Sequence, residues 1–124
     1  MTGGPGGGSV IDVKTAAARL GGGEEPAPLL LDVREPYEHA DVRAEGAVLA
    51  PMSKLAPLIP SLPKDRPIFV ICASGGRSAQ VTGFLLASGW TDVSNVTGGT
   101  VAWVQAGLPV RRGTPDPSES ELPG

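Results

Sequence analysis

The sequence predicts an α/β domain with a mainly parallel central sheet and helices on both faces, a three-layer α/β/α arrangement. Short apolar runs of strand length alternate along the chain with segments of helical pattern, which is typical of strands joined by right-handed helical crossovers. The runs at residues 29–31 and 68–71 are continuously apolar, as expected for strands buried on both faces. A chain of 124 residues has room for one such domain.

The first half of the chain alternates short strands with short helices. Asp12 suits the N-cap of an alanine-rich helix, and three consecutive glycines end that helix. Pro36 suits the first turn of a second helix, and Ser53 suits the cap of a helical turn that prolines then close. The expected strands here cover residues 10–11, 29–33 and 47–50, and the expected helices cover residues 13–20, 34–39 and 53–59.

The second half repeats the pattern with stronger signals. The apolar run before Cys72 is the most convincing strand of the chain, and a glycine-containing loop follows it directly. Gly89 ends the next helix, and the pair Gly98-Gly99 turns the chain into the last one. The expected strands here cover residues 67–71 and 93–97, and the expected helices cover residues 77–88 and 100–106.

Composition divides the chain into a domain and two ends. Many of the 18 glycines and 13 prolines lie in the terminal segments, where they favour solvated chain over packed structure. We therefore expect a flexible glycine-rich tail over residues 1–8, a folded domain over residues 9–113 and a second flexible tail over residues 114–124.

Charge and residue counts exclude several classes of function. The net charge of −3 and the scattered basic residues argue against nucleic acid as a partner. No apolar run approaches the roughly 20 residues of a membrane span, and the N-terminus lacks the pattern of a signal peptide. One cysteine and one histidine provide neither a disulfide nor a usual zinc site. We expect a cytoplasmic protein without metal, cofactor or membrane partner.

The chemistry is expected in the loop that follows the strand at 67–71. Cys72 lies at the carboxyl end of this strand, where open α/β sheets bind ligands. The glycines Gly75 and Gly76 allow backbone amides to approach a bound group, and the following helix directs its free N–H groups and positive dipole end at the loop. Arg77 adds a permanent positive charge. All of these features stabilise a thiolate.

A buried cysteine or a glycine-rich turn has an ordinary structural explanation when it stands alone. A lone cysteine after an apolar strand is usually a small core residue, and the role expected for Ser78 is that of a helix cap. The combination is more informative, because a strand, Cys72, four residues and Arg77 precede a helix. The loop has neither the length nor the lysine of a nucleotide-binding P-loop.

Three segments of the chain resemble the motifs of single-domain rhodaneses, in the order in which that family has them. The loop 72–78, CASGGRS, resembles their active-site loop, and LLDVREPYE at 30–38 is similar to their first motif. GGTVAW at 98–103, followed by AGLPV at 106–110, resembles their third motif. This resemblance implies a rhodanese-like domain over residues 9–113 that carries sulfane sulfur as a persulfide.

The resemblance also implies the roles of individual residues. Cys72 corresponds to the nucleophile and Arg77 to the arginine that closes the loop, so both are candidate catalytic residues. Asp32 and Arg34 correspond to a charged pair at the active-site face, although hydrogen bonding to the loop or a structural ion pair would explain them equally well. The candidate substrate-binding residues are Ala73, Ser74, Gly75, Gly76, Ser78, Asp32 and Arg34.

The expected partners are a small-molecule sulfur donor and a thiol or cyanide acceptor. Thiosulfate, mercaptopyruvate and a persulfide are the candidate donors, and the persulfide could be carried by a partner protein. Family members that use thiosulfate often have a basic residue just after the cysteine, whereas this chain has Ala73 and Ser74. Thiosulfate is therefore expected to be a poor substrate. The segment 42–47, VRAEGA, keeps only the final Gly-Ala of the family's usual GHIPGA.

Two other functions remain open at this point. Phosphatases and arsenate reductases of related fold also place a cysteine in an amide-lined loop, but the phosphatases have one residue more between cysteine and arginine. The shorter loop favours a single outer sulfur atom over a phosphate. A non-catalytic interaction or redox-sensing module is the second alternative, and the retained cysteine argues against it.

Overall fold

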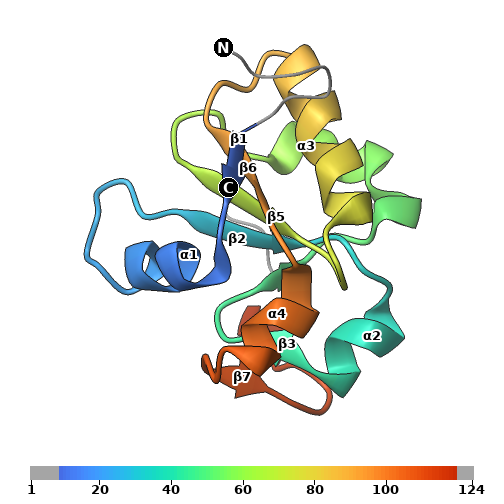
Figure 1. The fold of residues 1–124 in the computed structure, drawn as a ribbon. Helices are drawn as coiled ribbons and strands as arrows, with labels where there is room; N and C mark the ends of the chain where they lie inside the picture. Colours follow the sequence, from blue (N-terminus) through green and yellow to red (C-terminus); the bar gives the residue numbers. More distant parts are fainter. Residues whose placement is uncertain (1–8, 120–124) are drawn as a thin grey trace.

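A five-stranded parallel sheet forms the centre of the computed structural model, which describes residues 9–119 (Figure 1). The strand order is β1-β6-β5-β2-β4 and every neighbouring pair is parallel. This confirms the predicted fold class. The strands are β1 Ser9–Ile11, β2 Leu29–Asp32, β4 Val48–Leu49, β5 Ile68–Ile71 and β6 Val93–Val96.

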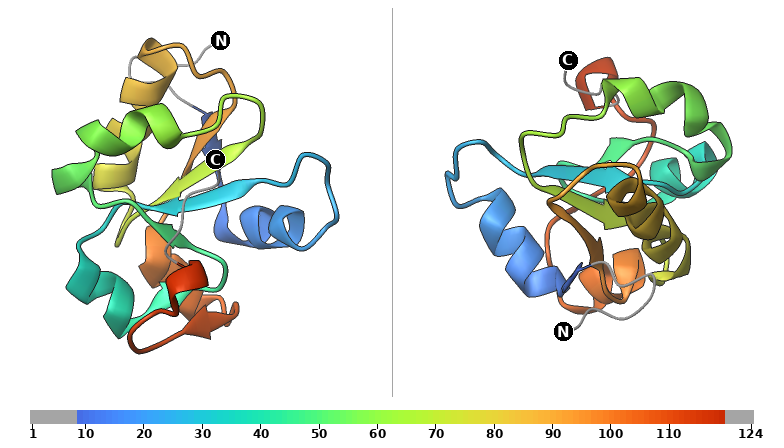
Figure 2. Two further views of the ribbon diagram at one scale, coloured as in Figure 1. Left: turned by 180° about the vertical axis from the view of Figure 1, so that it is seen from behind. Right: turned by 90° about the horizontal axis from the view of Figure 1, so that it is seen from above.

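Helices cover both faces of the sheet, as predicted (Figure 2). On one face, α1 (Val13–Leu20) and α4 (Gly99–Gln105) pack on Phe69 and Ile71 through Ala16 and Trp103. On the other face, α3 (Gly76–Ala87) packs through Val81 and Leu85 on Leu31 and Val70. β2 and β5 are buried along their whole length, because helices lie on both sides of them. The short helix α2 (Pro36–Asp41) follows the carboxyl end of β2.

The expected helical turn at 53–59 is present as a pair of 3-10 helices, η1 (Met52–Lys54) and η2 (Ala56–Ser61). Ser53 lies inside η1 and does not cap it, so the predicted cap was wrong. Its hydroxyl donates to the carboxylate of Glu35. Prolines 57 and 60 lie within η2 and lack the N–H that an α-helix needs.

A second, two-stranded sheet was not predicted. β3 (Arg43–Ala44) pairs antiparallel with β7 (Val110–Arg111), and each strand is too short to give a sequence pattern. Arg43 is 2% exposed and donates to the carbonyl of Gly113 and the carboxylate of Glu119. Glu119 lies in the final 3-10 helix η3 (Pro117–Glu119). The part of the expected tail at 114–119 is thus joined to the domain, while residues 1–8 and 120–124 lie outside the described structure.

The register of the sheet brings two candidate segments together. Asp32 pairs with Ile71 at the carboxyl ends of β2 and β5. Cys72 and Arg34, which follow these strands, therefore leave the sheet at the same edge. Among residues 9–119, no helix combines the length and apolar character that crossing a membrane requires.

Candidate functional site

The loop after β5 surrounds the sulfur of Cys72 with hydrogen-bond donors. Gly75 caps α3 with a left-handed backbone, φ 110°, and its N–H lies 3.1 Å from Cys72 Sγ. The Ser78 hydroxyl lies 3.2 Å away, and the N–H groups of Ser74 and Ser78 also help to lower the pKa of the thiol. Cys72 is 1% exposed and packs with the apolar core on the α3 side of the sheet. Of the backbone amides expected to approach a group bound at the loop, that of Gly75 forms a hydrogen bond with the sulfur.

These donors decide the charge state of the sulfur. Burial alone would raise the pKa of the Cys72 thiol, because it disfavours the anion. Hydrogen bonds from the Ser78 hydroxyl and from the N–H groups of Ser78, Gly75 and Ser74 outweigh burial, so the pKa is lowered. A lowered pKa makes the thiolate, which is the nucleophilic form, more abundant near neutral pH.

The N-terminus of α4 holds the loop in this orientation. The N–H groups of Thr100 and Val101 donate to the carbonyls of Cys72 and Ala73, at 2.8 and 3.0 Å. Gly99 has φ +60°, and a Cβ there would lie 2.5 Å from the Cys72 carbonyl oxygen. Since the loop carbonyls face α4, the loop N–H groups are free to face the sulfur. The Gly98-Gly99 pair therefore serves the site as well as the turn.

Ser78 is not a helix cap, which corrects the structural role expected for it. It lies inside α3, is fully buried and donates its hydroxyl toward Cys72 Sγ. The same hydroxyl oxygen lies 2.5 Å from Asn95 Oδ1 on β6. Sequence reasoning missed Asn95, because a single polar residue in a short strand gives no signal of which side chain it meets.

Arg77 is paired with a carboxylate that was also missed. Its two terminal nitrogens donate to Glu38 of α2 at 2.8 and 2.9 Å. The Arg77 hydrogen bonds lower the pKa of Glu38 to about 2, and the same pairing raises the pKa of Arg77. Glu38 thus holds the guanidinium beside the loop and compensates its charge. The guanidinium and Cys72 interact through charge alone, because the hydrogen bonds that lower the Cys72 pKa come from other groups.

Asp32 and Arg34 bind each other at the neighbouring strand end. Arg34 Nη2 donates to Asp32 Oδ2 at 2.8 Å and to the Val42 carbonyl at 2.7 Å. His39 Nδ1 lies 2.8 Å from the same carboxylate oxygen and carries the proton, because a carboxylate only accepts. Burial would raise the pKa of Asp32, but the hydrogen bonds from His39 and Arg34 outweigh it and the pKa is lowered.

Arg34 of this buried cluster borders a pocket next to the loop. Arg34 and Ala73 both line a small pocket of about 330 Å³, together with residues of α4. Within residues 9–119, no group of three or more histidine, cysteine or acidic side chains is placed to hold a metal ion.

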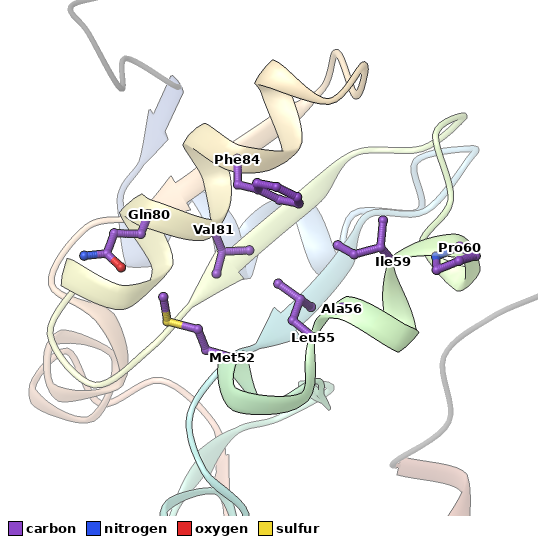
Figure 3. A pocket seen from close by; sticks show the side chains of 8 residues that line it. All are labelled: Met52, Leu55, Ala56, Ile59, Pro60, Gln80, Val81 and Phe84. Atoms are coloured by element: carbon purple, nitrogen blue, oxygen red, sulfur yellow. The ribbon is translucent and has the colours of Figure 1, made fainter.

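A larger groove runs between α3 and the two 3-10 helices (Figure 3). It has a volume of about 660 Å³, and Figure 3 shows Val81 and Phe84 of α3 facing Met52, Leu55 and Ile59 across it. Gln80 is its most polar lining residue, and no charged side chain lines it. The groove offers apolar contacts but no positive charge for an anionic ligand.

Comparisons with known proteins agree with this arrangement. The family model described as "Rhodanese-like domain" matches residues 12–106. A sulfurtransferase from Allochromatium vinosum is 36% identical over 81% of this chain and 92% of its own length. The thiosulfate sulfurtransferase GlpE from Vibrio cholerae is 29% identical over the same shares. A crystal structure of a rhodanese-related protein from Thermoplasma volcanium matches 83% of this chain and 97% of its own, at 31% identity and a TM-score of 0.73.

Proposed function

Because the chain belongs to the rhodanese-like domain family, we propose that it is a sulfurtransferase that carries sulfane sulfur on Cys72. The Cys72 thiolate attacks the outer sulfur of a donor. A bond forms between Sγ and that sulfur, and the bond to the donor breaks with its electron pair leaving on the donor. Cys72 then holds a persulfide with a negative outer sulfur.

The second half of the reaction regenerates the thiolate. An acceptor thiolate or cyanide attacks the outer sulfur, and the bond to Sγ breaks with its electron pair returning to Cys72. Neither half requires a proton to be removed from a weakly acidic nucleophile, because the lowered pKa favours the thiolate. No general base is therefore needed, and the buried His39 is engaged with Asp32 instead.

The observation that carries this proposal is the set of donors around Cys72 Sγ. The Gly75 N–H and the Ser78 hydroxyl lie within hydrogen-bond distance of the sulfur, the N–H groups of Ser74 and Ser78 also lower its pKa, and preorganised donors of this kind stabilise developing negative charge. The same cup would serve the outer sulfur of a persulfide. Four residues lie between Cys72 and Arg77, a short span that suits one added sulfur atom better than the oxygens of a phosphate.

The charges around the loop favour a persulfide donor over thiosulfate. Arg77 is paired with Glu38 and Arg34 with Asp32, so neither arginine offers an uncompensated charge. Ala73 and Ser74 add none. Thiosulfate carries two negative charges and an ionised alkyl persulfide only one. We therefore propose a small-molecule or protein persulfide as the donor, although a relative is named for thiosulfate. We also propose a thiol as the acceptor and the cytoplasm as the compartment.

The test is intact-mass spectrometry after exposure to an alkyl persulfide or thiosulfate. The protein should gain the mass of one sulfur atom, more readily from the persulfide, and lose it on addition of cyanide or dithiothreitol. Cys72→Ser is nearly isosteric and should remain folded but gain nothing. Hydrolysis of aryl phosphates by the wild-type protein, with no sulfur added by either donor, would contradict the proposal.

A further inference from the structure

The hydroxyl of Ser78 lies between two hydrogen-bond acceptors. Its oxygen is 3.2 Å from Cys72 Sγ and 2.5 Å from Asn95 Oδ1. A serine hydroxyl has one proton, so it can serve only one of them at a time. On its other side the Asn95 amide donates to the Gly75 carbonyl across 3.3 Å. These contacts link the sulfur, a hydroxyl and an amide in one short chain.

The charge of the sulfur determines which arrangement of this chain is favourable. When Cys72 is a neutral thiol, the Ser78 proton satisfies Asn95 Oδ1, which is much closer than the sulfur. When Cys72 is a thiolate, the charged acceptor attracts the proton more strongly. Asn95 Oδ1 would then face the lone pairs of the Ser78 oxygen with no proton between them. Turning the amide over removes this conflict, because Nδ2 then donates to Ser78 while Ser78 donates to the sulfur.

We propose that Asn95 is a positioning residue for Cys72, and that its amide turns over as the sulfur becomes anionic. The turned amide holds the Ser78 proton on the sulfur and polarises the hydroxyl. In exchange it gives up the 3.3 Å hydrogen bond to the Gly75 carbonyl and turns Oδ1 toward that carbonyl oxygen, a cost that the stronger hydrogen bond to the charged sulfur must exceed. Asn95 is well placed for this, because β6 pairs with β5 and therefore lies directly beside the strand that ends at Cys72.

Other charged groups near the sulfur keep fixed partners in both arrangements. Arg77 of α3 pairs with Glu38 of α2, and Asp32 at the end of β2 binds Arg34 and His39. They form a constant background, whereas Ser78 and Asn95 respond to the sulfur by moving one proton and one amide.

The first test is an NMR titration that observes the Asn95 side-chain amide. Asn95 is the only asparagine in the chain, so asparagine labelled with ¹⁵N at its side chain gives one amide pair. We expect this pair to shift with pH at the same midpoint as Cys72 alkylation, and to stop shifting in Cys72→Ser and in Ser78→Ala. The exposed Gln80 and Gln105, labelled separately, should not follow this midpoint. An Asn95 pair that ignores Cys72, or that titrates fully in Ser78→Ala, would overturn the proposal.

The second test replaces Asn95, whose Oδ1 accepts from the Ser78 hydroxyl. Asn95→Asp leaves only acceptor oxygens beside Ser78, so the hydroxyl cannot be released to the sulfur. The thiolate fraction near neutral pH should fall about tenfold, as for one lost hydrogen bond to a charged group. In a Ser78→Ala background the same substitution should have a clearly smaller effect, because only its charge remains. Equal effects in the two backgrounds would show that Asn95 does not act through Ser78. Neither test uses a sulfur donor, so each is decided independently of the proposed sulfurtransferase activity.

Discussion

Two polar clusters lie side by side at the carboxyl edge of the sheet. They differ in whether their hydrogen-bond donors are already paired with a carboxylate of the protein. Around Cys72 at the end of β5, the Gly75 N–H and the Ser78 hydroxyl donate to a single sulfur atom, and the N–H groups of Ser74 and Ser78 also favour its anion. Around Asp32 at the end of β2, Arg34 and His39 donate to the Asp32 carboxylate, and Arg34 also donates to the Val42 carbonyl. The first cluster can stabilise a new negative charge, whereas the second is already neutralised.

This difference separates the reacting group from its support. The Asp32 cluster fixes Arg34 beside the Val42 carbonyl and ties β2 to α2 through His39. α2 in turn carries Glu38, which holds Arg77 at the loop. We infer that the Asp32 cluster acts on the loop through packing, and that substitutions there should change stability far more than they change the sulfur's reactivity.

The largest expected effect comes from breaking the Asp32 cluster. Asp32→Asn leaves the Arg34 guanidinium buried without its carboxylate. It should lower the free energy of unfolding, measured in urea, by about 3–5 kcal/mol. The exposed Asp41 on α2 provides the control, because Asp41→Asn should change stability little. Below the unfolding transition, the pH midpoint of Cys72 alkylation should stay close to that of the wild type. A large shift of that midpoint in a folded Asp32→Asn protein would show that the two clusters are not distinct.

The next effect tests the support of the loop by α4. In Gly99→Ala, the new Cβ would overlap the carbonyl oxygens of Cys72 and Ala73, so the loop must move and its N–H groups must leave the sulfur. Gly107→Ala is the matched control, since Gly107 also has a positive φ but has nothing within 4 Å of the added Cβ. Both variants should lose about 1–2 kcal/mol to backbone strain. Only Gly99→Ala should also raise the pKa of Cys72 and slow persulfide formation, and equal reactivity of the two would refute the role of Gly99.

The sequence predicted the regular elements well, because continuous apolar runs and terminal glycines mark buried strands and helix ends locally. It also singled out Cys72 and Arg77, which lie in one short loop. It failed where the partner lies far along the chain. Glu38 is 39 residues from Arg77, Asn95 is 17 from Ser78, and Glu119 is 76 from Arg43. Such pairs follow from strand order and helix packing, which local patterns do not encode.

The smallest expected effect concerns the choice of donor. Glu38→Gln leaves the charge of Arg77 uncompensated, so the ratio of kcat/KM for thiosulfate to that for an alkyl persulfide should rise about fivefold. That ratio corresponds to about 1 kcal/mol, the scale of a partly exposed ion pair. An unchanged ratio would mean that Arg77 does not select the donor.

The same substitution has a pH signature in stability. The pKa of Glu38 is lowered to about 2 from 4.5, so its ionised form stabilises the fold above pH 4.5 and this contribution is lost as the pH falls toward 2. The difference in unfolding free energy between wild type and Glu38→Gln should therefore shrink over that interval. A difference that is constant with pH would contradict the ion pair.

The pH dependence of Cys72 alkylation by iodoacetamide tests the central claim most directly. Cys72 is the only thiol in the chain, so the rate reports on this sulfur alone, and the urea-unfolded chain provides the reference. In the folded protein the midpoint should lie below that of the unfolded chain, whose cysteine should titrate near the ordinary value of about 8.5. A folded midpoint at or above the unfolded one would show that burial outweighs the loop's donors, and that Cys72 is not held ready as a nucleophile.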